Sequence, residues 1–129
     1  MSARTIRNAI ALLAVLAVVS GAVWWREARR TAPVDPHGLP RLVDVGANAC
    51  EACQKLAPIL AELREEYAGR LSVEVVDLLE TTGAREQYDV SVMPTQVLYD
   101  AAGVEVWRHE GFIAKADLRA IIAAELGVE

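Results

Sequence analysis

The sequence is poor in cysteine, histidine and aromatic residues. Of its 129 residues, two are cysteines and two are histidines, and only 5% are aromatic. Two cysteines cannot form a four-cysteine zinc site, and His37 and His109 lie far from them along the chain, so a mixed zinc site is not expected. A haem attachment motif is excluded because Gln54, not histidine, follows the second cysteine. We therefore expect no metal and no cofactor.

Internal repeats, low-complexity tracts and long charged tails are also absent, and the length suits one small domain plus a targeting segment. The net charge is −5, yet residues 1–30 hold five arginines and one glutamate, so the acidic excess lies in the remainder of the chain. An acidic domain lacks the basic face that nucleic acids require. We expect a soluble, monomeric domain that does not bind nucleic acid.

Residues 9–25, AIALLAVLAVVSGAVWW, form a run without charge, and arginines stand on both sides of it. About 17–20 apolar residues are needed to cross a bilayer core, and Trp24 and Trp25 suit the membrane interface. This pattern predicts that residues 1–30 form a signal anchor with a transmembrane helix. A small-x-small site at residues 20–22 leaves a cleavable signal peptide open as the alternative. We expect the domain to lie outside the cytoplasmic membrane, facing the periplasm or the cell exterior of a bacterium.

Residues 31–40 contain three prolines and a glycine, which is typical of an extended linker. Residues 41–129 then alternate between short β-branched runs and segments with helical spacing. Strands are predicted at residues 42–45, 71–77, 95–99 and 104–109, and helices at 51–67, from Thr81 or Thr82 to Tyr88, and at 114–126. The order β-α-β-α-β-β-α predicts an α/β domain whose central mixed sheet is covered by helices, with a right-handed parallel first crossover.

The two cysteines form the motif Cys50-Glu51-Ala52-Cys53 at the junction of the first strand and the first helix. A disulfide between residues so close in sequence adds little chain-entropy stabilisation, which favours a redox role over a structural one. Cys50 is predicted at the N-terminus of the helix, where free N–H groups and the helix dipole stabilise a thiolate. We therefore assign Cys50 as the nucleophile and Cys53 as the resolving cysteine.

A second motif, Val92-Met93-Pro94-Thr95, follows about 40 residues later, just before a predicted strand. Together with the cysteine pair it resembles the thioredoxin family, and the resemblance covers most of residues 40–129. It implies a minimal thioredoxin-like fold, with Pro94 as a cis-proline packed against the cysteines. It also implies that the free backbone groups of Met93 pair with an extended substrate and that Gly111 lets this substrate approach.

Asp44 lies within an apolar strand, six residues before Cys50. Burial of a carboxylate is costly, and desolvation raises the pKa of such a group. The resemblance implies that Asp44 is the proton acceptor for Cys53. The chain departs from the family where aromatic residues usually precede the first cysteine, where Glu-Ala replaces Gly-Pro between the cysteines, and where a lysine usually partners the aspartate. We place Val73 near that lysine position.

These residues predict a thiol–disulfide oxidoreductase that acts on protein disulfides. The negative charge of Glu51, placed beside the substrate site, opposes thiolate formation and favours a reductase. A disulfide-forming oxidant and a thioredoxin-like binding module without turnover remain alternatives, as does a metal carrier that uses the cysteine pair. The resemblance implies that a membrane-embedded thiol carrier supplies electrons, and the lipid bilayer is a further expected partner through residues 1–30.

Overall fold

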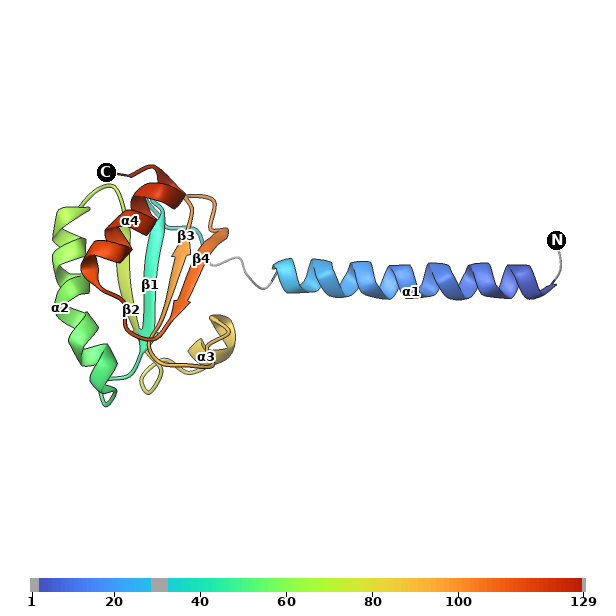
Figure 1. The fold of residues 1–129 in the computed structure, drawn as a ribbon, viewed down its shortest axis with the longest axis horizontal. Coiled ribbons are helices and arrows are strands. Elements are labelled where there is room, and N and C mark those ends of the chain that lie inside the picture. The colour runs from blue at the N-terminus through green and yellow to red at the C-terminus, as the bar shows by residue number, and fades with distance from the viewer. Residues whose placement is uncertain (1–2, 29–32, 129) are drawn as a thin grey trace. The chain divides into compact units, whose positions relative to one another are not determined.

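A computed structural model describes residues 3–28 and 33–128, and the chain divides into two units, Met1–Arg30 and Thr31–Glu129. The second unit contains seven elements (Figure 1). They are β1 (Arg41–Gly46), α2 (Glu51–Glu66), β2 (Ser72–Asp77), α3 (Ala84–Gln87), β3 (Thr95–Tyr99), β4 (Glu105–Glu110) and α4 (Lys115–Leu126). The predicted order β-α-β-α-β-β-α is confirmed, and no strand end differs from its predicted position by more than one residue.

The described residues of the first unit form the helix α1 (Ala3–Ala28). Its large apolar side chains with described positions, from Ile10 to Trp24, are more than half exposed. Within the described residues, however, no helix is both long enough and apolar enough to cross a membrane, so the predicted transmembrane helix is not supported. The predicted flanking residues Arg29 and Arg30 lie outside the described part of the chain.

The four strands form one mixed sheet in the order β2-β1-β3-β4. Strand β1 pairs with β2 in parallel, because α2 returns the chain across the sheet, and it pairs with β3 antiparallel. Strands β3 and β4 form the predicted antiparallel hairpin. Strand β1 is therefore central, and the loop that leaves its carboxyl end leads directly to the cysteine pair.

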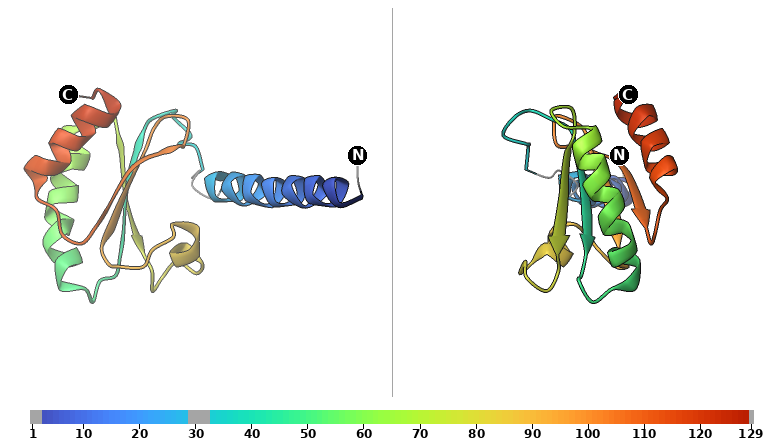
Figure 2. Two further views of the ribbon diagram at one scale, coloured as in Figure 1. Left: turned by 45° about the vertical axis from the view of Figure 1, so that its right-hand side comes forward. Right: turned by 90° about the vertical axis from the view of Figure 1, so that its left-hand side faces the viewer.

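Helices α2 and α4 cover one face of the sheet and α3 lies on the other (Figure 2). The alternation of side chains along β1 and β3 creates both faces: Leu42 and Leu98 point toward α2 and α4, whereas Val43 and Val97 point toward α3. The larger cluster is completed by fully buried residues of α2 and α4, namely Leu56, Leu60, Leu63, Leu118 and Ile122. This packing sets the N-terminus of α2 beside the end of β1.

The helix predicted from Thr81 or Thr82 is shorter than expected and begins later. Helix α3 covers only four residues, and its N-cap is Gly83 in the left-handed region at φ 81°, with no side-chain capping hydrogen bond. The predicted threonine cap is therefore wrong. Before the helix, the chain is held by turns, in which the N–H of Thr81 donates to the carbonyl of Asp77.

Candidate functional site

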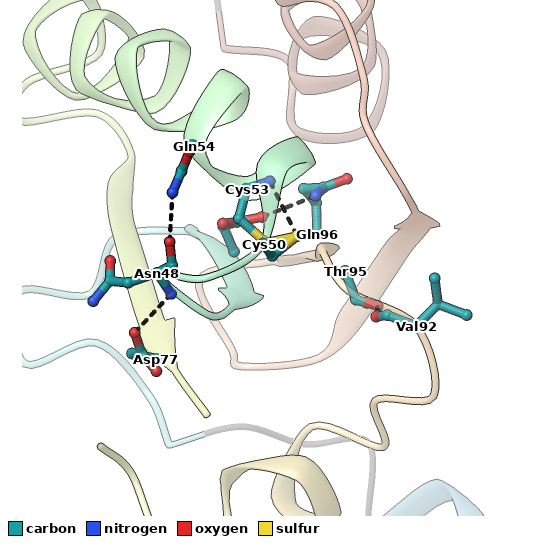
Figure 3. The surroundings of a disulfide bond; sticks show 9 residues. Asn48, Cys50, Cys53, Gln54, Asp77, Val92, Thr95 and Gln96 are labelled. Atoms are coloured by element: carbon teal, nitrogen blue, oxygen red, sulfur yellow. Dashed lines mark hydrogen bonds between the residues drawn. A yellow bond between two sulfur atoms is a disulfide. The ribbon is translucent and has the colours of Figure 1, made fainter. Parts of the chain in front are cut away.

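The two cysteines form a disulfide at the first turn of α2 (Figure 3). Cys50 is the N-cap residue, with extended backbone angles of φ −89° and ψ 120°, and its Cα lies 5.2 Å from that of Cys53. A tight turn delivers it there, because the N–H of Cys50 donates to the carbonyl of Ala47 at 3.0 Å. This is the position that the sequence pattern predicts for Cys50.

The helix terminus supplies the electrostatics of the site. The backbone N–H of Cys53 donates to the Sγ of Cys50 at 3.3 Å, so one of the free N–H groups of the first turn already points at this sulfur. The same contact would stabilise a Cys50 thiolate after reduction. Cys50 is partly exposed, whereas Cys53 is only 9% exposed. An incoming disulfide can therefore reach Cys50 more readily than Cys53.

The loop between β1 and α2 is fixed by two polar residues that the sequence did not suggest. The side chain of Gln54 donates from Nε2 to the carbonyl of Asn48 at 2.8 Å, and the N–H of Asn48 donates to Asp77 at 3.1 Å (Figure 3). These bonds tie the loop to α2 and to the end of β2.

Gly46 is the last residue of β1 and lies against the resolving cysteine. A Cβ added at this position would lie 2.7 Å from the Sγ of Cys53 and 3.9 Å from Oδ2 of Asp44. Contacts of 2.7 Å are too short for carbon and sulfur, so only glycine fits. Asp44 and Cys53 therefore both lie near the side of Gly46 where a side chain would stand, and nothing in the local sequence around Gly46 predicts this approach.

Asp44 is buried, with 2% of its surface exposed, which excludes the alternative of an exposed edge aspartate. Desolvation raises the pKa of Asp44 to about 6, and a hydrogen bond from Gln96 acts in the opposite direction. Nε2 of Gln96 donates this bond to Oδ1 of Asp44 at 2.8 Å. The residue opposite Asp44 on β2 is Val75, which corrects the placement of Val73 at the missing lysine position.

A pocket of about 370 Å³ reaches both Asp44 and Cys53 from the side of β2. Its polar lining includes Asn48, Asp77 and Glu80. A cavity of this size and polarity holds water. Water can therefore carry protons between solvent, the carboxyl group of Asp44 and the sulfur of Cys53.

Pro94, Met93 and Gly111 lie together at the start of β3 and the end of β4. The Met93–Pro94 peptide bond is cis. The N–H of Gly111 donates to the carbonyl of Pro94 at 2.7 Å. Gly111 has a backbone φ of 95°, which residues other than glycine rarely adopt. Met93 is 38% exposed, and the neighbours Val92 and Phe112 are also exposed apolar residues.

The side chain of Glu51 is exposed to solvent and is not buried against the sulfur atoms. Its side chain is 82% exposed and forms an ion pair with Lys55, one turn later on α2, at 2.7 Å. The pair places a positive charge beside the glutamate, which reduces the field that Glu51 exerts on Cys50. A metal-ligating group of three or more His, Cys, Asp or Glu side chains is absent from the described residues.

Comparison with known proteins agrees with this arrangement. The family model described as Thioredoxin matches residues 33–124. A thioredoxin of Acidithiobacillus ferridurans is 37% identical over 87 residues, which cover 67% of this chain and 80% of that protein. A thioredoxin of Pseudomonas aeruginosa is 32% identical over 87 residues, which again cover 67% of this chain and 80% of that protein. The M-type chloroplast thioredoxin of Spinacia oleracea is 33% identical over 61 residues, which are 47% of this chain and 34% of that protein.

Proposed function

We propose a function from the premise that this chain belongs to the thioredoxin family and is a disulfide oxidoreductase with a CxxC site. Thioredoxins act on protein disulfides, and the function that we propose is the reduction of disulfides in exported proteins. One observation carries the proposal: Cys50 caps α2 and is partly exposed, while Cys53 lies one turn later and shares a pocket with the buried Asp44. The proposed nucleophile, resolving thiol and proton acceptor thus lie together near the carboxyl end of the central strand β1.

The first step is an attack on the substrate by the reduced protein. The Cys50 thiolate, stabilised by the N-terminus of α2, attacks one sulfur of the substrate disulfide. A mixed disulfide forms between Cys50 and the substrate as the substrate S–S bond breaks. The departing substrate sulfur leaves as a thiolate and takes a proton from water. The exposed apolar residues Val92, Met93 and Phe112 offer a surface for the chain around that disulfide.

The second step releases the product. Cys53 gives its proton to the carboxylate of Asp44, through a water molecule in the adjoining pocket, and its thiolate attacks the Sγ of Cys50. The Cys50–Cys53 disulfide forms, and the bond from Cys50 to the substrate breaks. The second substrate sulfur leaves as a thiolate and is protonated. Two electrons have passed from the dithiol to the substrate, and the protein is left in the disulfide form described above.

We place the reaction at the bacterial inner membrane, with the domain on the periplasmic or outer side. Support comes from the uncharged run of residues 9–25 and from the exposed apolar side chains of α1. We propose that α1 attaches the protein to the lipid bilayer and that a membrane-embedded thiol carrier reduces the Cys50–Cys53 disulfide. Fractionation tests this placement: recovery of the full chain with the membrane fraction supports it, and recovery with the soluble cytoplasmic proteins contradicts it.

Insulin reduction by the full chain tests the activity, with dithiothreitol as the reductant. Wild type should precipitate the insulin B chain, and Cys50→Ser should be inactive. When Cys53→Ser is reduced beforehand and mixed with insulin without dithiothreitol, it should accumulate a mixed disulfide that added dithiothreitol releases. If wild type is inactive while both variants bind a partner as well as wild type does, a binding module replaces the proposed reductase.

The reduction potential tests the direction of electron flow. Equilibration with glutathione or dithiothreitol, followed by thiol alkylation, measures it. A potential near or below about −230 mV supports a reductase, as in the range from glutaredoxins to thioredoxin. A potential near about −120 mV reverses the direction and identifies a disulfide-forming oxidant.

A further inference from the structure

We propose that Gln96 is a positioning residue for the resolving step: its side-chain amide orients the Asp44 carboxyl group and stabilises it both before and after it takes the proton of Cys53. This inference rests on the proposed function, because it assumes that Asp44 accepts that proton. Gln96 lies on β3, two residues after Pro94, and it is fully buried. The sequence alone presents it only as one polar residue in an apolar strand.

The geometry of the sheet brings Gln96 to Asp44. The antiparallel register of β1 and β3 places the two residues directly opposite each other, 52 positions apart in sequence. Side chains at paired positions share one face of the sheet. Nε2 of Gln96 therefore reaches Oδ1 of Asp44 at 2.8 Å, inside the core and away from competing water.

The other neighbours of Asp44 leave this task to Gln96. On β2 the paired residue is Val75, which has neither charge nor hydrogen-bonding capacity. From the remaining elements, Cys53 of α2, Asp77 at the end of β2 and Glu80 after it line the pocket that reaches Asp44. The carboxylates and the Cys53 thiolate cannot donate to Asp44 when ionised. The neutral pocket residues Asn48, Gln54 and Thr81 can donate, but among the described residues the side-chain hydrogen bond to Asp44 comes from Gln96. Beyond Gln96, the paired residue on β4 is His109, whose Nε2 lies 3.3 Å from the carbonyl of Phe112.

The second polar atom of Gln96 argues against a purely structural role. Oε1 is buried and has no hydrogen-bond partner among the described residues. A buried polar atom without a partner costs stability, so an apolar side chain of similar shape would suit the core better. The amide therefore occupies this position at the expense of stability.

An amide differs from a lysine or a leucine because it can bond both forms of a carboxyl group. Its NH₂ donates to the carboxylate, as the structure shows for Asp44. After rotation of the amide by half a turn, Oε1 can accept a hydrogen bond from the protonated carboxyl group. In the resolving step the proton moves from the sulfur of Cys53 to Asp44, so the group next to Gln96 changes from acceptor to donor. Gln96 stabilises both sides of that transfer.

The test replaces Gln96 with methionine, which has nearly the same shape and no hydrogen-bonding amide, in the full chain. The carboxyl ¹³C signal of Asp44 is titrated by NMR in the oxidised protein. We expect the titration midpoint of Asp44 to rise by about one pH unit, because the charge-assisted bond from Nε2 to the carboxylate is stronger than the neutral bond that Oε1 can accept from the protonated group. The control Gln87→Met, on the exposed side of α3, should leave the midpoint unchanged.

The kinetic arm follows the release of thiol from a preformed mixed disulfide on Cys50, in a single turnover, between pH 5 and 9. Gln96→Met should slow release by about tenfold near pH 6 and by much less near pH 9, where Cys53 loses its proton without help. Equal slowing at every pH, or an unchanged Asp44 midpoint, overturns the proposal. Gln96→Leu repeats both arms and keeps the test decisive if the methionine variant folds poorly.

Asp44→Asn separates this proposal from the function on which it rests. If Asp44→Asn does not change the pH profile of thiol release, the proton-acceptor role of Asp44 fails, and the role of Gln96 fails with it. If Asp44→Asn slows release but Gln96→Met behaves as wild type, only the positioning role is wrong. In the Asp44→Asn background, Gln96→Met should have no further effect on the profile, which is the expected sign of two residues acting together.

Discussion

Gly46 and Cys53 are in contact so close that no side chain fits between them: a Cβ on Gly46 would lie 2.7 Å from the Sγ of the cysteine. The glycine ends β1 and the cysteine lies in the first turn of α2, so their contact joins the sheet to the active-site helix. The absence of a side chain at position 46 therefore decides where the resolving sulfur lies.

We predict that Gly46→Ala pushes Cys53 away from its position and lowers both stability and turnover. Overpacking of a buried site of this kind costs about 1–3 kcal/mol of unfolding free energy. Urea denaturation of the oxidised protein measures it, and insulin reduction should fall in parallel. The mixed disulfide with Cys50 should persist longer because the resolving sulfur is displaced.

The double variant Gly46→Ala, Cys53→Ala isolates the cause. Removal of the Sγ leaves the Cβ of residue 53 at 3.4 Å from the added methyl group, a far milder contact. Gly46→Ala should therefore cost much less in the Cys53→Ala background than in wild type. An equal cost in both backgrounds would show that the backbone, not the sulfur, excludes a side chain at position 46.

Asp44 should make the protein less stable as the pH rises. Its pKa is about 6 in the folded protein and 3.8 in the unfolded reference, so the folded state binds the proton more tightly. The stabilisation from this group is complete below about pH 4 and is lost as the pH rises through about 6. With about 1.4 kcal/mol for each pH unit, the loss is roughly 2–3 kcal/mol at pH 7.

The comparison of Asp44→Asn with wild type measures this effect without the other carboxyl groups. The variant should be more stable than wild type at pH 7, and the difference should shrink toward zero near pH 4. Denaturation of both proteins at several pH values gives the curve. A difference that does not depend on pH would contradict a raised pKa for Asp44 and point to packing instead.

Much of the fold could be predicted from sequence because its signals are local. β-branched runs and helical spacing fall within short windows, and they predict the order of all seven elements of the domain. The position of Cys50 at the N-terminus of α2 followed from the same boundary between strand and helix. Asp44 stood out because a carboxylate is unusual in an apolar strand.

The parts that could not be predicted depend on pairing between distant segments. In the sequence, nothing distinguishes Gln96 from other strand residues. Only the pairing of β1 with β3 places it opposite Asp44. The register also decides that Val75, not Val73, faces that aspartate. Side-chain direction alternates along a strand, and only the pairing with another strand identifies the contacts. The threonine cap failed because Gly83, with its left-handed backbone, begins α3 instead.

Glu51 should have only a small effect on the redox balance of the cysteines. Its side chain is exposed and paired with Lys55, so solvent and the neighbouring charge reduce its field at Cys50. We predict that Glu51→Gln changes the reduction potential by less than about 30 mV, which corresponds to about 1.4 kcal/mol for two electrons. The change should be toward a more oxidising value, because removal of the negative charge favours the thiolate.

The matched variant Lys55→Gln removes the opposite charge of the same pair. It should move the potential in the other direction by a similar small amount, and 0.5 M salt should reduce both effects. Thiol alkylation after equilibration with glutathione measures all three proteins. A shift from Glu51→Gln well above about 30 mV would make this residue the main determinant of electron direction.

The ion pair between Arg41 and Glu74 should contribute far more to stability than the exposed pair of Glu51 and Lys55. Arg41 is only 6% exposed and donates two hydrogen bonds of 2.7 Å to Glu74, across the β1–β2 boundary. Glu74→Gln leaves a buried guanidinium without its counter-charge, at a cost on the order of 2 kcal/mol. Glu51→Gln should cost less than about 0.5 kcal/mol of unfolding free energy, because Glu51 and Lys55 are both exposed to solvent. Urea denaturation at low and high salt compares them: equal costs, or loss of the Glu74 effect in 1 M salt, would show that the Arg41 pair is effectively solvated too.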